Sequence, residues 1–90
     1  MTISERIARN AKYLCHKQGK KLQDLEAEVG VSQGYLSRVK GRRIIPIDTA
    51  YEFAHSLNID IESLMFRNFA KEDKLYRLER EIADLKKGED

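Results

Sequence analysis

Apolar residues near the start of the chain recur three or four positions apart, which is the spacing of one helical face. These apolar positions are Ile3, Ile7, Ala11, Leu14 and Cys15. Thr2 is followed three positions later by Glu5, the pattern of a capping box at a helix start. Gly19 supplies a left-handed stop beyond the last apolar position. The pattern therefore predicts a first helix between Thr2 and Gly19.

Four further short helices are predicted in residues 1–66. Their apolar positions are Leu22, Leu25 and Val29; Leu36 and Val39; Tyr51, Phe53, Ala54 and Leu57; and Ile61, Leu64 and Met65. Gly30 ends the second helix. Ser32 caps the third, which closes at Gly41, and Asp60 caps the fifth. No stretch alternates with period two for long enough to predict a strand, so the predicted class is all-α.

The remaining residues, 67–90, carry a different pattern, that of an amphipathic helix. Apolar residues occupy the a and d positions of two heptads at Leu75, Leu78, Ile82 and Leu85. Charged residues flank them at Lys74, Glu79, Glu81 and Lys86, with signs that attract in a parallel and in an antiparallel pair alike. The apolar stripe either forms a dimer contact or folds back onto its own domain. Two heptads do not decide between these alternatives.

Composition narrows the class of protein. The 90 residues are 41% hydrophobic and 36% charged, which allows one small domain with a tail. The chain has no apolar run long enough for a membrane span and a charged start unlike a signal peptide, so a cytoplasmic protein is expected. Cys15, the single cysteine, excludes an internal disulfide and offers no metal cluster.

Catalytic chemistry finds little support in the sequence. Cys15 and His16 are neighbours, so on a helix their side chains point about 100° apart and cannot form a nucleophile–base pair. Cys15 is expected to be a small buried hydrophobic residue, and His55 has no partner at a ligand-like spacing. Because no glycine-rich phosphate loop or metal motif is present, we expect no enzyme activity, cofactor, metal or small-molecule ligand.

Charge is distributed unevenly along the chain. The formal net charge is only +2, but residues 32–45 contain Arg38, Lys40, Arg42 and Arg43 and no acidic residue. A concentrated basic block in a mildly basic protein suggests a polyanionic partner.

The second and third predicted helices and the turn between them form a helix-turn-helix unit. Gly30 permits the turn, Val31 fills the gap between the helices, and Ser32 caps the next helix. The stretches Gly30-Val31-Ser32 and Tyr35-Leu36-Ser37-Arg38, with the later segment from Asp48-Thr49 to Met65, closely resemble the Cro/C1-type repressor family, also called the xenobiotic-response-element family. The resemblance covers about residues 3–66 and implies a five-helix, lambda-repressor-like domain.

The resemblance also implies sequence-specific binding of double-stranded DNA. Side chains at the start and middle of the third helix read bases in this family, which here are Gln33, Gly34, Ser37 and Arg38. Their chemistry fits, because Gln pairs bidentately with adenine and Arg with guanine. Gly34 has no side chain, so it either lets the backbone approach the DNA or is a tolerated first-turn glycine.

Phosphate contacts are expected from helix ends and from the loop after the third helix. The candidates are Lys20, Lys21, Ser32, Tyr35, Lys40, Arg42 and Arg43. Lys20 and Lys21 precede a helix start without a capping Ser or Thr, where a DNA phosphate would satisfy the helix dipole. The Tyr35 side chain either bonds a phosphate or covers the seam between helices. Glu26 departs from the family, which often has a small alanine there.

The predicted function is a small transcriptional regulator, a repressor that binds a palindromic operator as a homodimer. The domain would span residues 1–66, and residues 67–90 would contribute the dimer contact at the apolar stripe. An antitoxin-like protein that binds DNA and neutralises a partner is an alternative within the same class. An interaction adaptor that keeps the fold but not DNA binding is the rival from another class, and the basic block argues against it.

Overall fold

The computed structural model describes residues 1–40, 43–73, 78, 81–82 and 85. Its helices are α1 (Ile3–Lys17), α2 (Leu22–Val29), the 3-10 helix η1 (Leu36–Arg38), α3 (Ile47–Ser56) and α4 (Ile61–Phe66). The residues described contain no strand. The prediction of an all-α, five-helix domain is confirmed, although the third helix is much shorter than expected.

Local sequence signals set most of the helix ends. The capping box at α1 is complete, because the Glu5 amide donates to Thr2 Oγ1 and the Thr2 amide donates to Glu5 Oε1, each at 3.1 Å. Gly19 follows the end of α1 with a φ of 67°, as expected for the stop. The single proline, Pro46, directly precedes α3, where its fixed φ suits a helix start and its missing N–H costs nothing.

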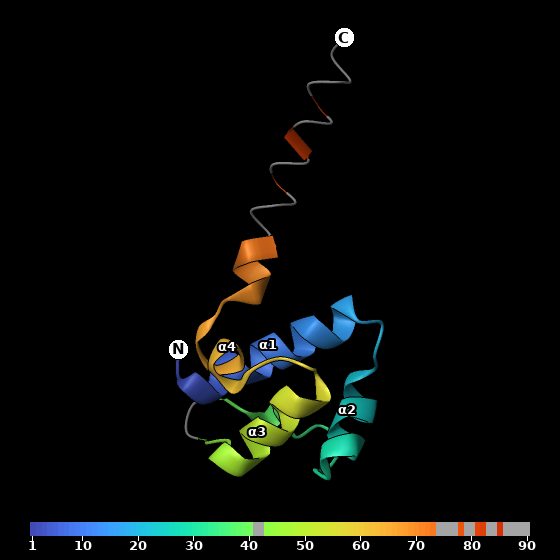
Figure 1. Ribbon diagram of the computed structural model, residues 1–90, viewed down its shortest axis with the longest axis vertical. Helices are drawn as coiled ribbons and strands as arrows, with labels where there is room; N and C mark the ends of the chain where they lie inside the picture. The colour runs from blue at the N-terminus through green and yellow to red at the C-terminus, as the bar shows by residue number, and fades with distance from the viewer. Residues whose placement is uncertain (41–42, 74–77, 79–80, 83–84, 86–90) are drawn as a thin grey trace.

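The core lies where the four α-helices and η1 converge. Its largest fully buried apolar side chains are Phe53, Ile7, Leu25, Leu36, Leu57 and Leu64. Helix α1 packs against α4, and α2 packs against α3 (Figure 1). Cys15 is 2% exposed in this core, and burial raises the pKa of its thiol. The expectation that Cys15 is a buried hydrophobic residue is therefore confirmed.

A buried amide ties α1 to the end of α4. Asn10 is 1% exposed, and its Nδ2 donates to the Leu64 carbonyl at 2.8 Å and to the Arg67 carbonyl at 2.7 Å. Carbonyls at a helix C-terminus have no partner within their own helix. Asn10 therefore satisfies two groups that would otherwise be left unbonded where the chain leaves the domain.

The chain continues beyond α4 into a helical stretch at residues 69–73. Asn68 caps it, since Asn68 Oδ1 accepts the Lys71 amide at 3.1 Å. Asp73 contacts α1 through a hydrogen bond from the Tyr13 hydroxyl and an ion pair with Lys17 Nζ at 3.0 Å. Desolvation and the Asp73 carboxylate raise the pKa of Tyr13. The stretch thus leaves the domain in a direction fixed by α1, away from α2 and α3 (Figure 1).

Loss of the Asn10 side chain should weaken the domain measurably. Asn10→Ala removes both bonds to the carbonyls of Leu64 and Arg67 and leaves those acceptors in a buried place, so we expect the free energy of unfolding to fall by about 2–3 kcal/mol. Gln18→Ala is the matched control, because its amide bonds one carbonyl, that of Leu57, at a more exposed site. Urea unfolding of both variants checks this, and an equal small loss in both would contradict it.

Candidate nucleic-acid interface

The turn between α2 and η1 follows the sequence prediction. Gly30 adopts a φ of 89°, in the left-handed region that a residue with a side chain rarely occupies. The Gly30 and Val31 amides both donate to the Glu26 carbonyl at 3.0 Å and so close the end of α2. The half-buried Val31 packs against the core. The chain therefore reverses tightly and brings the next segment, residues 32–39, alongside α2.

The 32–39 segment is not the α-helix that the sequence predicts. Its helical part is η1 alone, which begins at Leu36, and Ser32 caps no helix with its side chain. The physical reason is Gly34, whose φ of 86° is left-handed and interrupts a helix that would start at Ser32. The predicted end at Gly41 lies outside the described residues.

A buried carboxylate supplies the bonds that the shortened helix lacks. Glu26 is 2% exposed, and its Oε1 accepts the Gly34 amide at 3.1 Å while its Oε2 accepts the Leu36 amide at 2.9 Å. Sequence reasoning noted Glu26 only as a large residue in place of a small one. The signal in the sequence was a charged residue where the family often has a small alanine, because a charge buried at that place needs partners inside the domain.

A shallow hollow lies between the start of α2 and the 32–39 segment. The lining residues are Lys21, Leu22, Gln23, Glu26, Gln33, Gly34 and Ser37. Gln33 Nε2 donates to Gln23 Oε1 at 3.1 Å, so the two amides meet across the hollow. Of the predicted base contacts, Gln33, Gly34 and Ser37 thus share one surface. Gln23 was missed, and only its place in the exposed first turn of α2 could have suggested it.

The Arg38 side chain folds back onto the segment that carries it. Its Nε donates to the Gly34 carbonyl at 3.2 Å and its Nη2 to the Gln33 carbonyl at 2.5 Å. The side chain is exposed, and these bonds engage two of its five N–H donors. The guanidinium therefore lies over Gly34, where a Cβ would come within 3.2 Å of Nη2.

The residues predicted to contact phosphates lie in different environments in the structure. Lys21 is exposed at the start of α2, which has no side-chain cap, as the sequence suggested. Lys20 instead turns toward the far end of α2, where its Nζ pairs with Glu28 at 2.7 Å and lies 3.4 Å from Ser56 Oγ. Ser32, Lys40 and Arg43 are exposed. Arg42 lies outside the described residues.

The Tyr35 ring covers the seam between the 32–39 segment and α3. Its centroid is 6.2 Å from that of Phe53, and the Arg43 guanidinium carbon lies over the ring, 5.6 Å from the Tyr35 centroid. Of the two roles open from the sequence, the structure shows this packing role. The ring also places a cation beside the segment.

Comparison with known proteins agrees with this arrangement. A family model described as "Helix-turn-helix", HTH_3, matches residues 11–64, which is more than half of the 90 residues. The chain belongs to the Cro/C1-type helix-turn-helix family. No curated protein and no solved structure matches the chain significantly. The resemblance is confirmed, and membership makes the chain a DNA-binding protein of the transcription-regulator class.

Other parts of this helix-turn-helix chain offer less to a ligand. The described residues contain no group of three or more His, Cys, Asp or Glu side chains placed to hold a metal ion. Within the same residues, no helix is long and apolar enough to cross a membrane.

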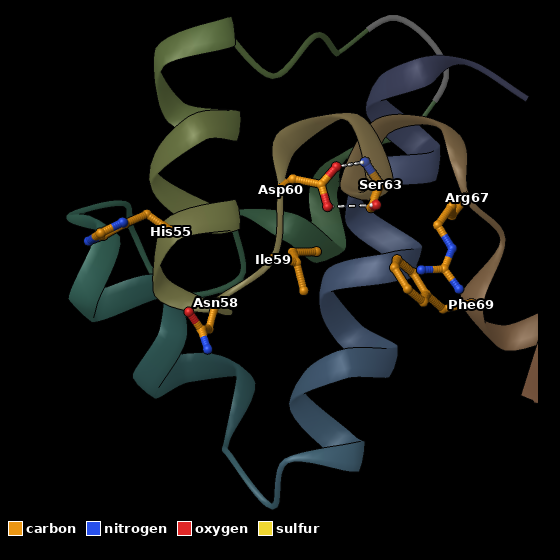
Figure 2. A pocket seen from close by; sticks show the side chains of 7 residues that line it. All are labelled: His55, Asn58, Ile59, Asp60, Ser63, Arg67 and Phe69. Carbon is orange, nitrogen blue, oxygen red and sulfur yellow. Dashed lines mark hydrogen bonds between the residues drawn. The ribbon is translucent and has the colours of Figure 1, made fainter.

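A second hollow lies at the corner between α3 and α4 (Figure 2). Figure 2 shows Asp60 bonded to Ser63 above Ile59, with Arg67 and Phe69 together on one side. The Arg67 guanidinium stacks 4.5 Å from the Phe69 centroid and pairs with Glu72 at 2.7 Å. Asp60 bonds Ser63 and Arg67 pairs with Glu72, so these polar groups already have partners. The Arg67 contacts also join the end of α4 to the 69–73 stretch.

The Asp60 cap should give the domain an acid-sensitive component of stability. The hydroxyl and amide of Ser63 donate to the Asp60 carboxylate and lower its pKa. A carboxyl whose pKa is lowered on folding stabilises the fold above its unfolded value, near 3.8, and that contribution is lost as the pH falls through the lowered value. Asp60→Asn keeps a good N-cap without an ionisable group, so the stability of wild type relative to the variant should fall as the pH drops below that unfolded value.

Urea unfolding of wild type and Asp60→Asn at neutral and acid pH checks this expectation. Asp48→Asn is the control, because Asp48 lies in the first turn of α3 and has no cap bond of this kind among those described. A difference between wild type and Asp60→Asn that stays constant with pH would contradict the assignment.

Proposed function

We propose that the chain binds a specific double-stranded DNA sequence as a symmetric homodimer and represses transcription by occupying a palindromic operator. The observation that carries the proposal is the hollow where Gln23, Gln33 and Ser37 meet, with Lys21 at its edge. Amide and hydroxyl side chains on one exposed surface are the groups that read base edges in a major groove.

Exposed cations at the start of α2 and just after the 32–39 segment supply the sequence-independent part of binding. Lys21, Lys40 and Arg43 are exposed, and lysine and arginine gain affinity from phosphates by releasing condensed counterions. The start of α2 adds backbone N–H groups without a side-chain cap, which favour an anion. These features support placing α2 across the DNA backbone with the 32–39 segment in the major groove.

Arg38 can read a base from its position over Gly34. Its two backbone bonds hold the guanidinium at the tip of the segment, and the remaining donors suffice for the bidentate contact that arginine makes with guanine. The proposed base contacts are therefore Gln33, Ser37 and Arg38, with the Gly34 backbone close to the groove.

Dimerisation is proposed to use the apolar stripe of the tail. Leu78, Ile82 and Leu85 are 45%, 53% and 68% exposed, whereas a helix folded back onto its own domain would bury them. The contacts of Asp73 with Tyr13 and Lys17 fix how the tail leaves the domain. Leu75 lies outside the described residues. A symmetric dimer would present two 32–39 segments about one turn of DNA, roughly 34 Å, apart.

Single substitutions should separate base reading from phosphate binding. Arg38→Ala should cost about 1–3 kcal/mol on the operator and relax the preference at one base pair. Lys40→Ala, its control of equal charge, should weaken binding to all sequences alike and reduce the salt slope by about one. Selection from a random DNA pool followed by titrations at several salt concentrations measures both. An equal loss on every sequence for Arg38→Ala would rule out its reading of a base.

The exposed stripe can be tested without shortening the chain. Replacing Leu78 and Ile82 together by Ser should leave the domain folded, because both side chains are exposed, and should shift the dimer toward monomer. Operator binding should then weaken more than non-specific binding, since a monomer contacts one half-site. Glu62→Ser is the control, because Glu62 is exposed in α4 and lies outside the tail. Sedimentation equilibrium measures the mass of wild type and of both variants. A double variant with the same mass as wild type would show that the stripe is not part of the dimer contact.

A further inference from the structure

The Glu26 carboxylate holds the 32–39 segment at two points. It accepts the amides of Gly34 and Leu36 from within the core. Leu36 is the first residue of η1, where a helix offers its own N–H groups no acceptor, and Gly34 lies two residues before it. We infer that Glu26 is a positioning residue for sequence readout, which fixes the direction in which Gln33 and Ser37 meet the DNA. This inference rests on the proposed function and names a part of its specificity.

The geometry requires both a carboxylate and a glycine. A carboxylate has two acceptor oxygens and can take both amides at once, whereas a glutamine side chain offers one oxygen and turns its NH₂ toward the second amide. The left-handed φ of Gly34 brings its amide to Glu26 Oε1. A residue with a Cβ would be strained in that conformation. Glu26 and Gly34 therefore specify one backbone path together.

One face of α2 aligns both the backbone and a side chain of the segment. Gln23 and Glu26 are three residues apart, so they lie on the same helical face. Glu26 bonds the backbone at Gly34 and Leu36, and Gln23 bonds the Gln33 side chain. A shift of the segment against α2 would break all three bonds. The alignment of Gln33 with the DNA therefore depends on Glu26, although Glu26 itself is buried.

The buried Glu26 carboxylate is better explained by the backbone path that it fixes than by a gain in the stability of the fold. Replacing buried charges with apolar groups is often neutral or stabilising, because desolvation offsets the attraction. What the carboxylate provides here is one arrangement for a segment that contains only one short helical turn. A loss of Glu26 should therefore affect discrimination between DNA sequences more than it affects affinity for DNA in general.

The deciding experiment compares Glu26→Gln with Glu28→Gln. Both remove one negative charge from α2, but Glu28 is exposed and pairs with Lys20, away from the hollow. The probes are a duplex enriched by the wild-type chain from a random pool and a shuffled duplex of the same length and composition. Glu26→Gln should lower the ratio of the two affinities about tenfold, comparable to a mismatched base pair. Glu28→Gln should leave that ratio unchanged, whatever it does to both affinities.

Amide hydrogen exchange provides a readout that needs no DNA. In Glu26→Gln, exchange at Gly34 and Leu36 should accelerate relative to the core amide of Phe53, whereas in Glu28→Gln it should match wild type. Faster exchange at Gly34 and Leu36 with a lowered affinity ratio supports the inference. An affinity ratio in Glu26→Gln equal to that of wild type overturns it.

Gly34→Ala covers the case in which Glu26→Gln does not fold. A Cβ at this position meets only the flexible Arg38 guanidinium, so the substitution strains the backbone path without entering the core. It should lower the affinity ratio as Glu26→Gln does, and an unchanged ratio would overturn the inference. If the wild-type chain enriches no sequence, the proposed function fails. Enrichment by wild type with an unchanged ratio in the variants refutes the role of Glu26 alone.

Discussion

The two hydrogen bonds to the Glu26 carboxylate are the constraint on which the surface between α2 and η1 depends. A segment with one short turn of helix cannot hold its shape by internal bonds, because helix formation is cooperative and its first turn is costly. The carboxylate provides that order from α2. These bonds hold the segment in place because α2 is itself anchored in the core by Leu25, which is 0% exposed. The Glu26 carboxylate therefore does not move with the segment.

The rest of the domain keeps this pairing in place. Helix α3 closes one side of α2 with Phe53, whose ring also meets Tyr35. Helix α1 lies behind and is bonded to α4 through Asn10. Every buried side-chain nitrogen and oxygen in the described residues has a hydrogen-bond partner. In a domain of this size, where burial is limited, such complete pairing avoids the cost of isolated polar groups.

Local signals in the sequence predicted most of the helix ends, and contacts distant in sequence explain what was missed. Thr2 with Glu5, Gly30 and Asp60 act within one turn of the chain, so their residue types suffice to predict them. Asn10 bonds a carbonyl 54 residues away, and Glu26 bonds amides 8 and 10 residues away. No residue pattern encodes such pairs. The third helix was predicted too long because the left-handed Gly34 interrupts it, and the Gly34 and Leu36 amides bond instead to Glu26 on another helix. The ion pair of Lys20 with Glu28, near the far end of α2, was also not anticipated.

Chemical labelling of the buried Cys15 thiol can report when the core of the domain opens. A thiol reacts with alkylating and oxidising agents as the thiolate, and burial both shields Cys15 and raises its pKa. Reaction must therefore wait for the core around α1 to separate. Because the chain has one cysteine, each labelled molecule records one opening event at one known place. When the reagent labels the exposed thiol faster than the core closes again, the rate of thiol modification equals the rate at which the core opens.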